Sequence, residues 1–275
     1  MVVFPKAKIN LGLNVVRKRP DGFHDIESVL LPIPLCDALE AVADEHVASG
    51  CLEFTRTGLP IDGDPMQDLV VKAHALVAAH RPLPGVRMHL HKRIPAGGGL
   101  GGGSSDGAHA LMLLDRLFGL SLTRTELLTM AASLGSDCPF FLHDGAQMAQ
   151  GRGEVLHPVD LDLHGYWLYL VNPGIHVSTK DVFAMATPTG QPSAMVDVLQ
   201  RTPLKEWRIE APNTLEPAVC RTHPEIGRLL EQLVESGADH AAMSGSGSTV
   251  FGLFRTRPVR LDWPASYRSW ILPLG

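Results

Sequence analysis

The chain has 275 residues, of which 45% are hydrophobic and 19% are charged. A chain of this size buries about three-quarters of the surface that its unfolded state exposes, which excludes wholesale disorder. The 24 Lys and Arg against 29 Asp and Glu give a net charge of −5. No broad positive field is therefore available to hold a polyanion, and a nucleic-acid partner is disfavoured. At roughly 100–200 residues per domain, the length favours two domains and leaves one domain open.

No apolar run reaches the roughly 18 residues that a membrane span needs, so we expect no membrane association. The first residues, Met-Val-Val-Phe-Pro-Lys, lack the basic start and apolar stretch of a secretion signal. Both observations predict a soluble cytoplasmic protein. The four cysteines form no C-x-x-C pair, which favours reduced structural thiols over a zinc ribbon or a redox motif. They are Cys36, Cys51, Cys138 and Cys220.

Strands are predicted over the first part of the chain. Residues 4–16 alternate between polar and apolar side chains, with the two-residue period of a strand. Residues 19–22, Arg-Pro-Asp-Gly, are typical of a turn. Residues 26–33 are predicted to form a second strand, and residues 35–43 a third.

Helices and strands then mix in irregular order. Asp68 is predicted to cap a helix, residues 86–90 alternate as a strand does, and Thr123 with Glu126 predicts a capping box at the start of another helix. Further on, a central strand is expected over residues 166–171, a helix over 226–233 and a strand over 249–254. This order favours an α+β fold over a doubly wound sheet, with a domain boundary near residue 155.

A glycine-rich loop is the most informative local feature. Six glycines lie between Gly97 and Gly103, directly before a segment with helical spacing of apolar residues. Glycines permit positive φ angles and let a ligand approach the main chain, and a helix N-terminus attracts anions, so the loop predicts phosphate binding. A flexible linker is the structural alternative, although linkers seldom lead straight into an apolar helix. Ser104 and Ser105 are candidates for oxygen contacts to a triphosphate or simply for a helix cap.

The loop matches neither of the two common phosphate-binding motifs. Gly97, Gly99 and Gly102 satisfy the spacing G-x-G-x-x-G, but a dinucleotide site needs a βαβ unit, and here a second helix follows the first. A Walker loop needs a lysine before its Ser or Thr, and this loop contains none. A phosphate loop of another class remains.

The segment from Pro95 to Ser105 is similar to the phosphate loop of the GHMP kinases. Four further blocks extend the resemblance from about residue 4 to residue 254 and narrow it to the branch that phosphorylates a cytidine-diphosphate-linked methylerythritol. These blocks are Pro-Lys-Ala-Lys-Ile-Asn at 5–10, Arg-Pro-Asp-Gly-Phe-His at 19–24, Leu-Gly-Ser-Asp-Cys-Pro at 134–139 and Ser-Gly-Ser-Gly at 244–247.

The resemblance implies transfer of the γ-phosphoryl group of ATP to a hydroxyl of that substrate, in the non-mevalonate route to isoprenoids. It implies a two-domain GHMP kinase fold with residues 1–155 like domain 2 of ribosomal protein S5 and residues 156–275 a ferredoxin-like α/β sandwich. ATP and substrate are expected in the cleft between the domains. Mg²⁺ is expected to arrive with ATP, held by phosphates and water, because it gives up its hydration shell reluctantly. No protein-bound metal is predicted.

The resemblance also assigns roles to residues. Asp137 is the expected base, and Lys8 the cation that keeps it ionised and stabilises the transferring group. Without the resemblance, Asp137 reads as a helix cap and Lys8 as a solvated strand lysine. The expected substrate-binding residues are Asn10, Phe23, His24, Thr179 and Phe183, with the two phenylalanine rings on either side of cytosine. The expected ATP-binding residues are Lys92, Pro95, Ala96, Gly97, Gly98, Gly99, Leu100, Gly101, Gly102, Gly103, Ser104 and Ser105.

Four positions depart from the family pattern. Phe23 stands where the family more often has Tyr, and Thr214 where Asp is more usual. Gln67 and Asp68 stand where the family has Asp and Asn, and that asparagine side chain contacts adenine. His89 and His91 share one strand face, but no third ligand is spaced to complete a metal site. A kinase for another small alcohol, such as homoserine or a mevalonate derivative, and a non-catalytic nucleotide-binding module remain the alternatives.

Overall fold

The computed structural model describes all 275 residues. Its strands are β1 (Val2–Val3), β2 (Lys6–Lys18), β3 (His24–Cys36), β4 (Ala38–Ala43), β5 (Leu52–Gly58), β6 (Val86–Lys92), β7 (Ala146–Gly151), β8 (Val155–Val159), β9 (Trp167–Asn172), β10 (His240–Met243), β11 (Val250–Phe254) and β12 (Arg268–Pro273). Its α-helices are α1 (Leu69–His80), α2 (Gly102–Phe118), α3 (Arg124–Leu134), α4 (Thr179–Met185), α5 (Met195–Arg201), α6 (Leu204–Glu210), α7 (Glu216–Thr222) and α8 (Pro224–Glu235). Short 3₁₀ helices cover Pro65–Gln67 and Cys138–Leu142. No helix is both long and apolar enough to cross a membrane.

The chain forms two compact units, each assembled from separate stretches of sequence. The first unit contains Met1–Ala7, Leu35–Ala96 and Gly101–Asp144, and the second contains Lys8–Pro34, Gly97–Leu100 and Gly145–Gly275. A single boundary near residue 155 divides the chain at one point, whereas these units alternate along it. The glycine loop contributes residues 97–100 to the second unit and residues from 101 onward to the first.

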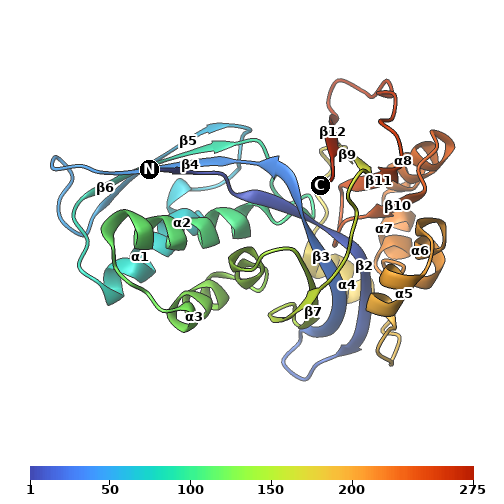
Figure 1. Ribbon diagram of the computed structural model, residues 1–275, viewed down its shortest axis with the longest axis horizontal. Coiled ribbons are helices and arrows are strands. Elements are labelled where there is room, and N and C mark those ends of the chain that lie inside the picture. The colour runs from blue at the N-terminus through green and yellow to red at the C-terminus, as the bar shows by residue number, and fades with distance from the viewer. The chain divides into compact units, whose positions relative to one another are not determined.

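In the first unit, a four-stranded sheet with the order β1-β4-β6-β5 packs against helices. Figure 1 shows α1, α2 and α3 on one side of this sheet. The side-chain pattern of β6 shows why the helices cover this sheet. Its apolar residues Val86, Met88 and Leu90 are fully buried, while the residues between them are not. Met88 and Leu90 pair in register with Ala41 and Leu39 of β4, which are also buried. The period of two thus places one apolar face under the helices.

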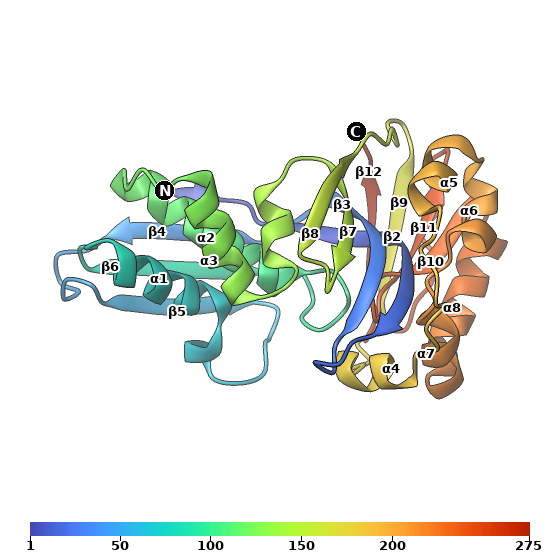
Figure 2. The ribbon, with the colours of Figure 1, turned by 90° about the horizontal axis from the view of Figure 1, so that it is seen from below.

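The second unit contains two four-stranded sheets, with the orders β2-β3-β7-β8 and β10-β11-β9-β12. Figure 2 shows α5, α6, α7 and α8 along one side of this unit. Helix α8 buries Ile226, Leu229, Leu230 and Leu233, at spacings of three and four residues, in a core that Tyr169 of β9 shares. This is the amphipathic pattern of a helix that covers a sheet.

Most sequence-based elements are confirmed, and the mixed order gives the predicted α+β class. Asp68 caps α1 by accepting a hydrogen bond from the backbone N–H of Val70. The capping box of Thr123 and Glu126 is present at α3. The third strand predicted over residues 35–43 is present as β4, but it begins at Ala38, because Asp37 separates it from β3. The carboxylate of Asp37 accepts from the backbone N–H groups of residues 93 and 94, so this residue between the two strands is tied to the end of β6.

Several elements had no sequence prediction, and β7 is an example. Its sequence, Ala-Gln-Met-Ala-Gln-Gly, contains no β-branched or aromatic residue. The strand forms because it lies between β3 and β8 in the sheet, with Ile26 to Leu30 opposite Gly151 to Gln147. Tertiary pairing therefore overrides the low strand propensity of the segment.

Candidate active site

The first half of the glycine loop packs tightly within the second unit. Gly97 and Gly99 adopt φ angles of +67° and +77°. A Cβ on Gly98 would lie 2.6 Å from Nδ2 of Asn172, and a Cβ on Gly99 would lie 2.0 Å from the carbonyl oxygen of Ser244. Glycine is thus required at these positions by backbone conformation and close packing, before any ligand is considered.

The second half of the loop opens helix α2 in the first unit. Gly101 is the N-cap, with φ of +68° and no side-chain capping bond, and Gly102 is the first helical residue. Neither serine is the cap, so that alternative is wrong. Ser105 is fully buried with its hydroxyl 3.3 Å from Nδ1 of His109, and Ser104 hydrogen-bonds the Cys138 thiol. The first backbone N–H groups of a helix lack intrahelical acceptors, which suits them to an anion.

Gly103 lies in this first helical turn and differs from its neighbours. A Cβ on Gly103 would meet no atom within 4 Å, and the residue is exposed. Neither packing nor backbone conformation demands glycine there. A ligand that approaches the main chain closely is a reason for the missing side chain.

Lys92, a predicted ATP ligand, is buried in the first unit at 2% exposure. Its ammonium pairs with the carboxylates of Asp37 and Asp106, the latter at 2.6 Å. Burial alone disfavours the charged ammonium, but the two carboxylates outweigh it and raise the pKa of Lys92. Burial raises the pKa of Asp106 well above its ordinary value, against the opposing effect of Lys92. This buried triad joins the ends of β3 and β6 to the first turns of α2.

Lys8 and Asn10 lie two residues apart on β2, on one face, as predicted. Both are buried at 4% exposure. Nζ of Lys8 donates to Oδ1 of Asn10 at 2.7 Å, and Nδ2 of Asn10 donates to Oγ of Ser28 at 2.7 Å. The amide of Asn10 therefore orients the lysine, a role that the sequence did not predict.

Asp137 belongs to the first unit, whereas Lys8 belongs to the second. It directly precedes the 3₁₀ helix of Cys138–Leu142, and its side chain makes no capping hydrogen bond there. The alternative reading of Asp137 as a helix cap is thus wrong. Its pairing with Lys8 stays a prediction.

The predicted cytosine-binding side chains gather in the second unit, around the turn between β2 and β3. The rings of His24 and Phe183 lie 5.4 Å apart and are tilted by 31°. Phe23 is 53% exposed, and the guanidinium of Arg152 lies 5.0 Å from its ring centroid. Oγ1 of Thr179 lies 2.9 Å from Oγ of Ser246. Burial foremost, and then Lys18, lower the pKa of His24, so its imidazole is neutral near pH 7 and offers one donor and one acceptor.

Two of the departures from the family pattern have structural roles. The Asp68 carboxylate caps α1 and lies 3.5 Å from Arg56, so it is engaged where the family uses an asparagine toward adenine. Oγ1 of Thr214 accepts from the backbone N–H of Val15 at 3.1 Å.

The sequence analysis assigned no role to four residues that contact a predicted site residue. They are Asp37 and Asp106 beside Lys92, Arg152 beside Phe23, and Ser244 beside Gly99. Arg152 stands between two glycines at the β7–β8 turn, with φ angles of +68° at Gly151 and +113° at Gly153, and a Gly-Arg-Gly sequence is typical of a turn. Nothing in the sequence indicated that this turn lies beside Phe23, because that contact depends on the pairing of β3 with β7.

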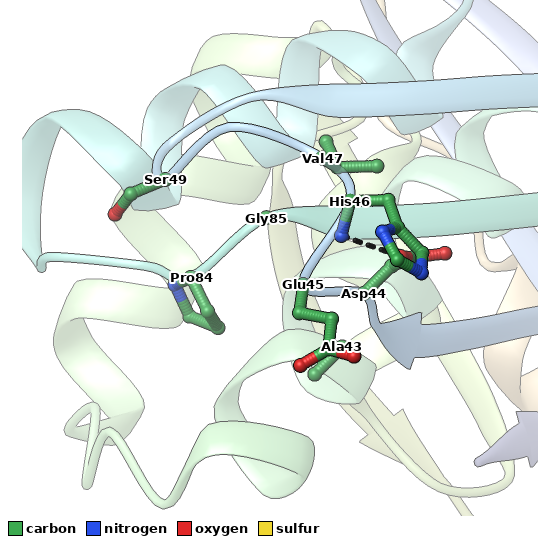
Figure 3. A pocket seen from close by; sticks show the side chains of 8 residues that line it. All are labelled: Ala43, Asp44, Glu45, His46, Val47, Ser49, Pro84 and Gly85. Carbon is green, nitrogen blue, oxygen red and sulfur yellow. Dashed lines mark hydrogen bonds between the residues drawn. The ribbon is translucent and has the colours of Figure 1, made fainter.

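Two other features contain none of the predicted catalytic, ATP-binding or substrate-binding residues. A hollow of about 730 Å³ in the first unit is lined by the end of β4, the loop after it, Pro84 and Gly85. Figure 3 shows these lining residues. On β6, His89 and His91 both contact the hydroxyl of Thr57, at 2.9 and 3.0 Å. No group of three or more His, Cys, Asp or Glu side chains is arranged to hold a metal ion.

The comparisons with known proteins agree with this arrangement. Residues 68–145 match the family described as "GHMP kinases N terminal domain", and residues 195–262 match "GHMP kinases C terminal". The 4-diphosphocytidyl-2-C-methyl-D-erythritol kinase of Cytophaga hutchinsonii is 44% identical over 276 residues and covers 100% of both chains. The chain belongs to this kinase family. The relative of the same name from Parabacteroides distasonis is 45% identical over 92% of each chain.

Solved structures support the family and its fold. A crystal structure of 4-(cytidine 5'-diphospho)-2C-methyl-D-erythritol kinase has a TM-score of 0.77 and 32% identity, with 100% of both chains covered. A homoserine kinase from Cytophaga hutchinsonii has a TM-score of 0.72 at 14% identity, covering 100% of this chain and 94% of that one, and shares the fold. The two-domain GHMP kinase fold expected from the sequence is confirmed.

Proposed function

We propose that the protein phosphorylates the 2-hydroxyl of 4-diphosphocytidyl-2-C-methyl-D-erythritol with ATP, giving the 2-phosphate and ADP in the non-mevalonate pathway of isoprenoid biosynthesis. The observation that carries the proposal is the full-length 44% identity to a relative of that name. Support from the geometry is the glycine loop before α2, Lys8 oriented on β2, and the contact between the rings of His24 and Phe183.

The step needs positioning and charge neutralisation more than covalent chemistry by the protein. The substrate hydroxyl oxygen forms a bond to the γ-phosphorus, the bond to the β–γ bridging oxygen breaks, and ADP leaves with that oxygen. In our proposal Asp137 accepts the hydroxyl proton, and Lys8 stabilises the negative charge of the group in transfer. The N–H groups of the glycine loop and of the first turn of α2 hold the phosphate oxygens.

Mg²⁺ enters this proposal with ATP. The chain offers no cluster of carboxylates and imidazoles for a resident metal. The hydroxyl oxygen of Ser104, half-buried at the start of α2, would accept a hydrogen bond from a water of a hydrated Mg²⁺. The ion supplies charge neutralisation of the triphosphate. We also propose that the enzyme acts in the cytoplasm.

The direct test is turnover by purified protein with Mg-ATP and the cytidyl substrate, with ADP and the phosphorylated product both measured. Homoserine and mevalonate at equal concentration serve as competing acceptors. Phosphorylation of the cytidyl compound far above the others is expected, because a cytosine pocket contributes binding energy that small alcohols cannot use. Absence of ADP formation with the cytidyl compound would contradict the proposal, and preference for another alcohol would reassign the substrate.

The role of Asp137 has its own test. Asp137→Asn should lower kcat by about 10²–10⁴-fold with ATP binding retained, since the amide cannot accept the proton. Asp262→Asn, at an exposed position in the C-terminal loop, is the control and should leave kcat unchanged. Undiminished turnover in Asp137→Asn would remove the base from the proposal.

A further inference from the structure

The turn of Ser244 to Gly247, between β10 and β11, is a motif that the proposed reaction has not used. Its first residue, Ser244, is fully buried, and its backbone N–H donates to the carbonyl of Thr249 at 2.9 Å. Nδ2 of Asn213 donates to the carbonyls of Met243 and Gly245, both at 2.8 Å. The turn is thus held firmly from two sides, and the direction of the Ser244 side chain is fixed by its surroundings.

The hydroxyl of Ser244 joins two predicted site residues within the second unit. Oγ donates to the carbonyl oxygen of Gly99 at 2.8 Å and accepts from the backbone N–H of Asn10 at 3.2 Å. A serine hydroxyl has one proton to donate, and the shorter contact to Gly99 uses it. The contact of 3.4 Å to Oδ1 of Asn10 then adds no second donated bond. The glycine loop and β2 are therefore bridged by one side chain.

On the other side of the bridge, the hydrogen bonds continue to the lysine. Asn10 accepts from Nζ of Lys8 at 2.7 Å and donates to Oγ of Ser28 at 2.7 Å. Ser28 in turn donates to the carbonyl of Gly12 at 2.6 Å. Lys8 donates to Asn10, Asn10 donates to Ser28, and Ser28 donates to a carbonyl that can only accept. The amide of Asn10 is therefore fixed in the orientation that turns its oxygen toward Lys8.

The bond to Gly99 also affects the phosphate loop directly. The carbonyl of Gly99 and the N–H of Leu100 share one planar peptide group. Fixing the carbonyl on Ser244 therefore fixes the direction of the Leu100 N–H. The backbone N–H of Lys8 donates to the next carbonyl, that of Leu100, at 2.9 Å. Two consecutive carbonyls of the loop are thus held by Ser244 and by the backbone of the lysine itself.

We propose that Ser244 is a positioning residue that sets the phosphate loop and Lys8 in one arrangement, so that nucleotide binding and orientation of the cation depend on the same hydroxyl. It touches neither substrate nor the transferred group and acts through Gly99 and Asn10. The predicted effect on kcat rests on the proposed function. The predicted effect on ATP affinity rests only on the contact of Ser244 with the glycine loop.

A matched control, Ser248, distinguishes a positioning role of Ser244 from a purely structural role. Ser248 lies in the same β10–β11 connection, is also fully buried, and donates its hydroxyl proton to the carbonyl of Ile175 at 2.6 Å. It has no hydrogen bond to the glycine loop or to β2. Ser244→Ala and Ser248→Ala each remove one buried hydroxyl and should lower the melting temperature by comparable amounts.

The experiment compares the two variants with the full-length wild type. We expect Ser244→Ala to lower kcat by about tenfold or more and to weaken ATP binding by a similar factor, whereas Ser248→Ala stays within about twofold on both. Equal kinetic and binding effects in the two variants, or none in Ser244→Ala, would overturn the inference. Should Ser244→Ala not fold, Ser244→Cys fills nearly the same space with a much weaker donor. It must then lower both ATP affinity and kcat more than Ser248→Cys does.

ATP titration by calorimetry, without any acceptor, separates this inference from the proposed function. If the wild type binds ATP but does not use the cytidyl compound, the proposed substrate is wrong, and the ATP affinities of the two variants still decide the role of Ser244. A double mutant cycle with Asn10→Ala adds a second readout. The losses in kcat should be less than additive if both residues orient Lys8 through one path.

Discussion

The carboxylate of Asp106 lies 2.6 Å from the ammonium of Lys92, and neither side chain is more than 2% exposed. Asp37 is the second carboxylate on the same ammonium, and its other oxygen accepts from two backbone N–H groups, of residues 93 and 94. Oδ1 of Asp106 is buried without a hydrogen-bond partner. A buried cluster with two negative charges and one positive charge is unfavourable, so we infer that Asp106 carries the proton.

Asp106→Asn should therefore be mild and Asp37→Asn severe. The amide replaces a neutral carboxyl at residue 106, and the free energy of unfolding near pH 7 should change by less than about 1 kcal/mol. At residue 37 the substitution removes the counterion of Lys92 and should cost about 3–5 kcal/mol of unfolding free energy.

The raised pKa of Asp106 also predicts a pH dependence of stability. The contribution of Asp106 to the free energy of unfolding is greatest below the ordinary pKa of an aspartate, and it declines as the pH rises toward the pKa in the folded state. Urea unfolding at several pH values should show a flatter profile for Asp106→Asn, and equal destabilisation by the two variants would mean that Asp106 is ionised.

Gly99→Ala and Gly103→Ala should separate packing from ligand binding in the phosphate loop. Gly99 has φ of +77° and no room for a Cβ, so alanine there should destabilise the fold by about 1 kcal/mol or more. Gly103 is helical with open space, and alanine there should stabilise the apo protein by about 0.5–1 kcal/mol. ATP titration should nevertheless show weaker binding for Gly103→Ala if phosphates approach the main chain there. Unchanged ATP affinity in a stabilised Gly103→Ala would move the phosphates away from that turn.

Arg152→Met should affect binding of the cytidyl substrate selectively. The guanidinium lies over the Phe23 ring and pairs with Glu154 at 3.6 Å, so it holds an otherwise exposed ring in place. An exposed cation–π contact contributes about 0.5–1 kcal/mol, which corresponds to a KM increase of about two- to fivefold. The KM for ATP and kcat should not change. Arg255→Met, which removes a comparable contact to Tyr166 at 5.4 Å, is the control, and an equal rise in KM there would count against a role for Arg152.

His240 should make the second unit sensitive to acid. Its ring lies between Trp207 and Phe251, with centroids 5.8 and 5.7 Å away, and both ring nitrogens are buried without partners. Burial foremost, and then Arg208, lower its pKa from 6.5 to about 4. The unfolded chain therefore binds a proton that the folded chain rejects, and stability is lost as the pH falls from about 6.5 to about 4. The loss from this one residue is about 3 kcal/mol.

His240→Leu keeps an apolar side chain in that position and should remove this part of the pH dependence. The readout is the difference in unfolding free energy between variant and wild type across that pH range, because this difference isolates the contribution of His240. His157→Gln, at an exposed position of β8, should leave the profile unchanged. A wild-type profile that persists in His240→Leu would mean that the ring is protonated or solvated in the folded state.

The local part of the site could be predicted because it follows from short-range chemistry. Positive φ angles at Gly97, Gly99 and Gly101, the cap at Asp68 and the shared face of Lys8 and Asn10 each depend on residues within a few positions of one another. Such patterns are visible in a sequence because steric limits on the backbone and the periods of strands and helices act locally.

The sequence by itself determined the α+β class, the helix caps and the conformation of the glycine loop, because glycine conformation, capping and side-chain period are properties of neighbouring residues. The residue roles in phosphoryl transfer came from the family resemblance and stay predictions. Only the tertiary structure decided that Ser244 holds Gly99 and Asn10, that Arg152 lies over Phe23, and that two carboxylates enclose Lys92. These contacts join residues far apart in the chain. Their formation depends on strand register and on burial that excludes water, and neither is set by any short stretch of sequence.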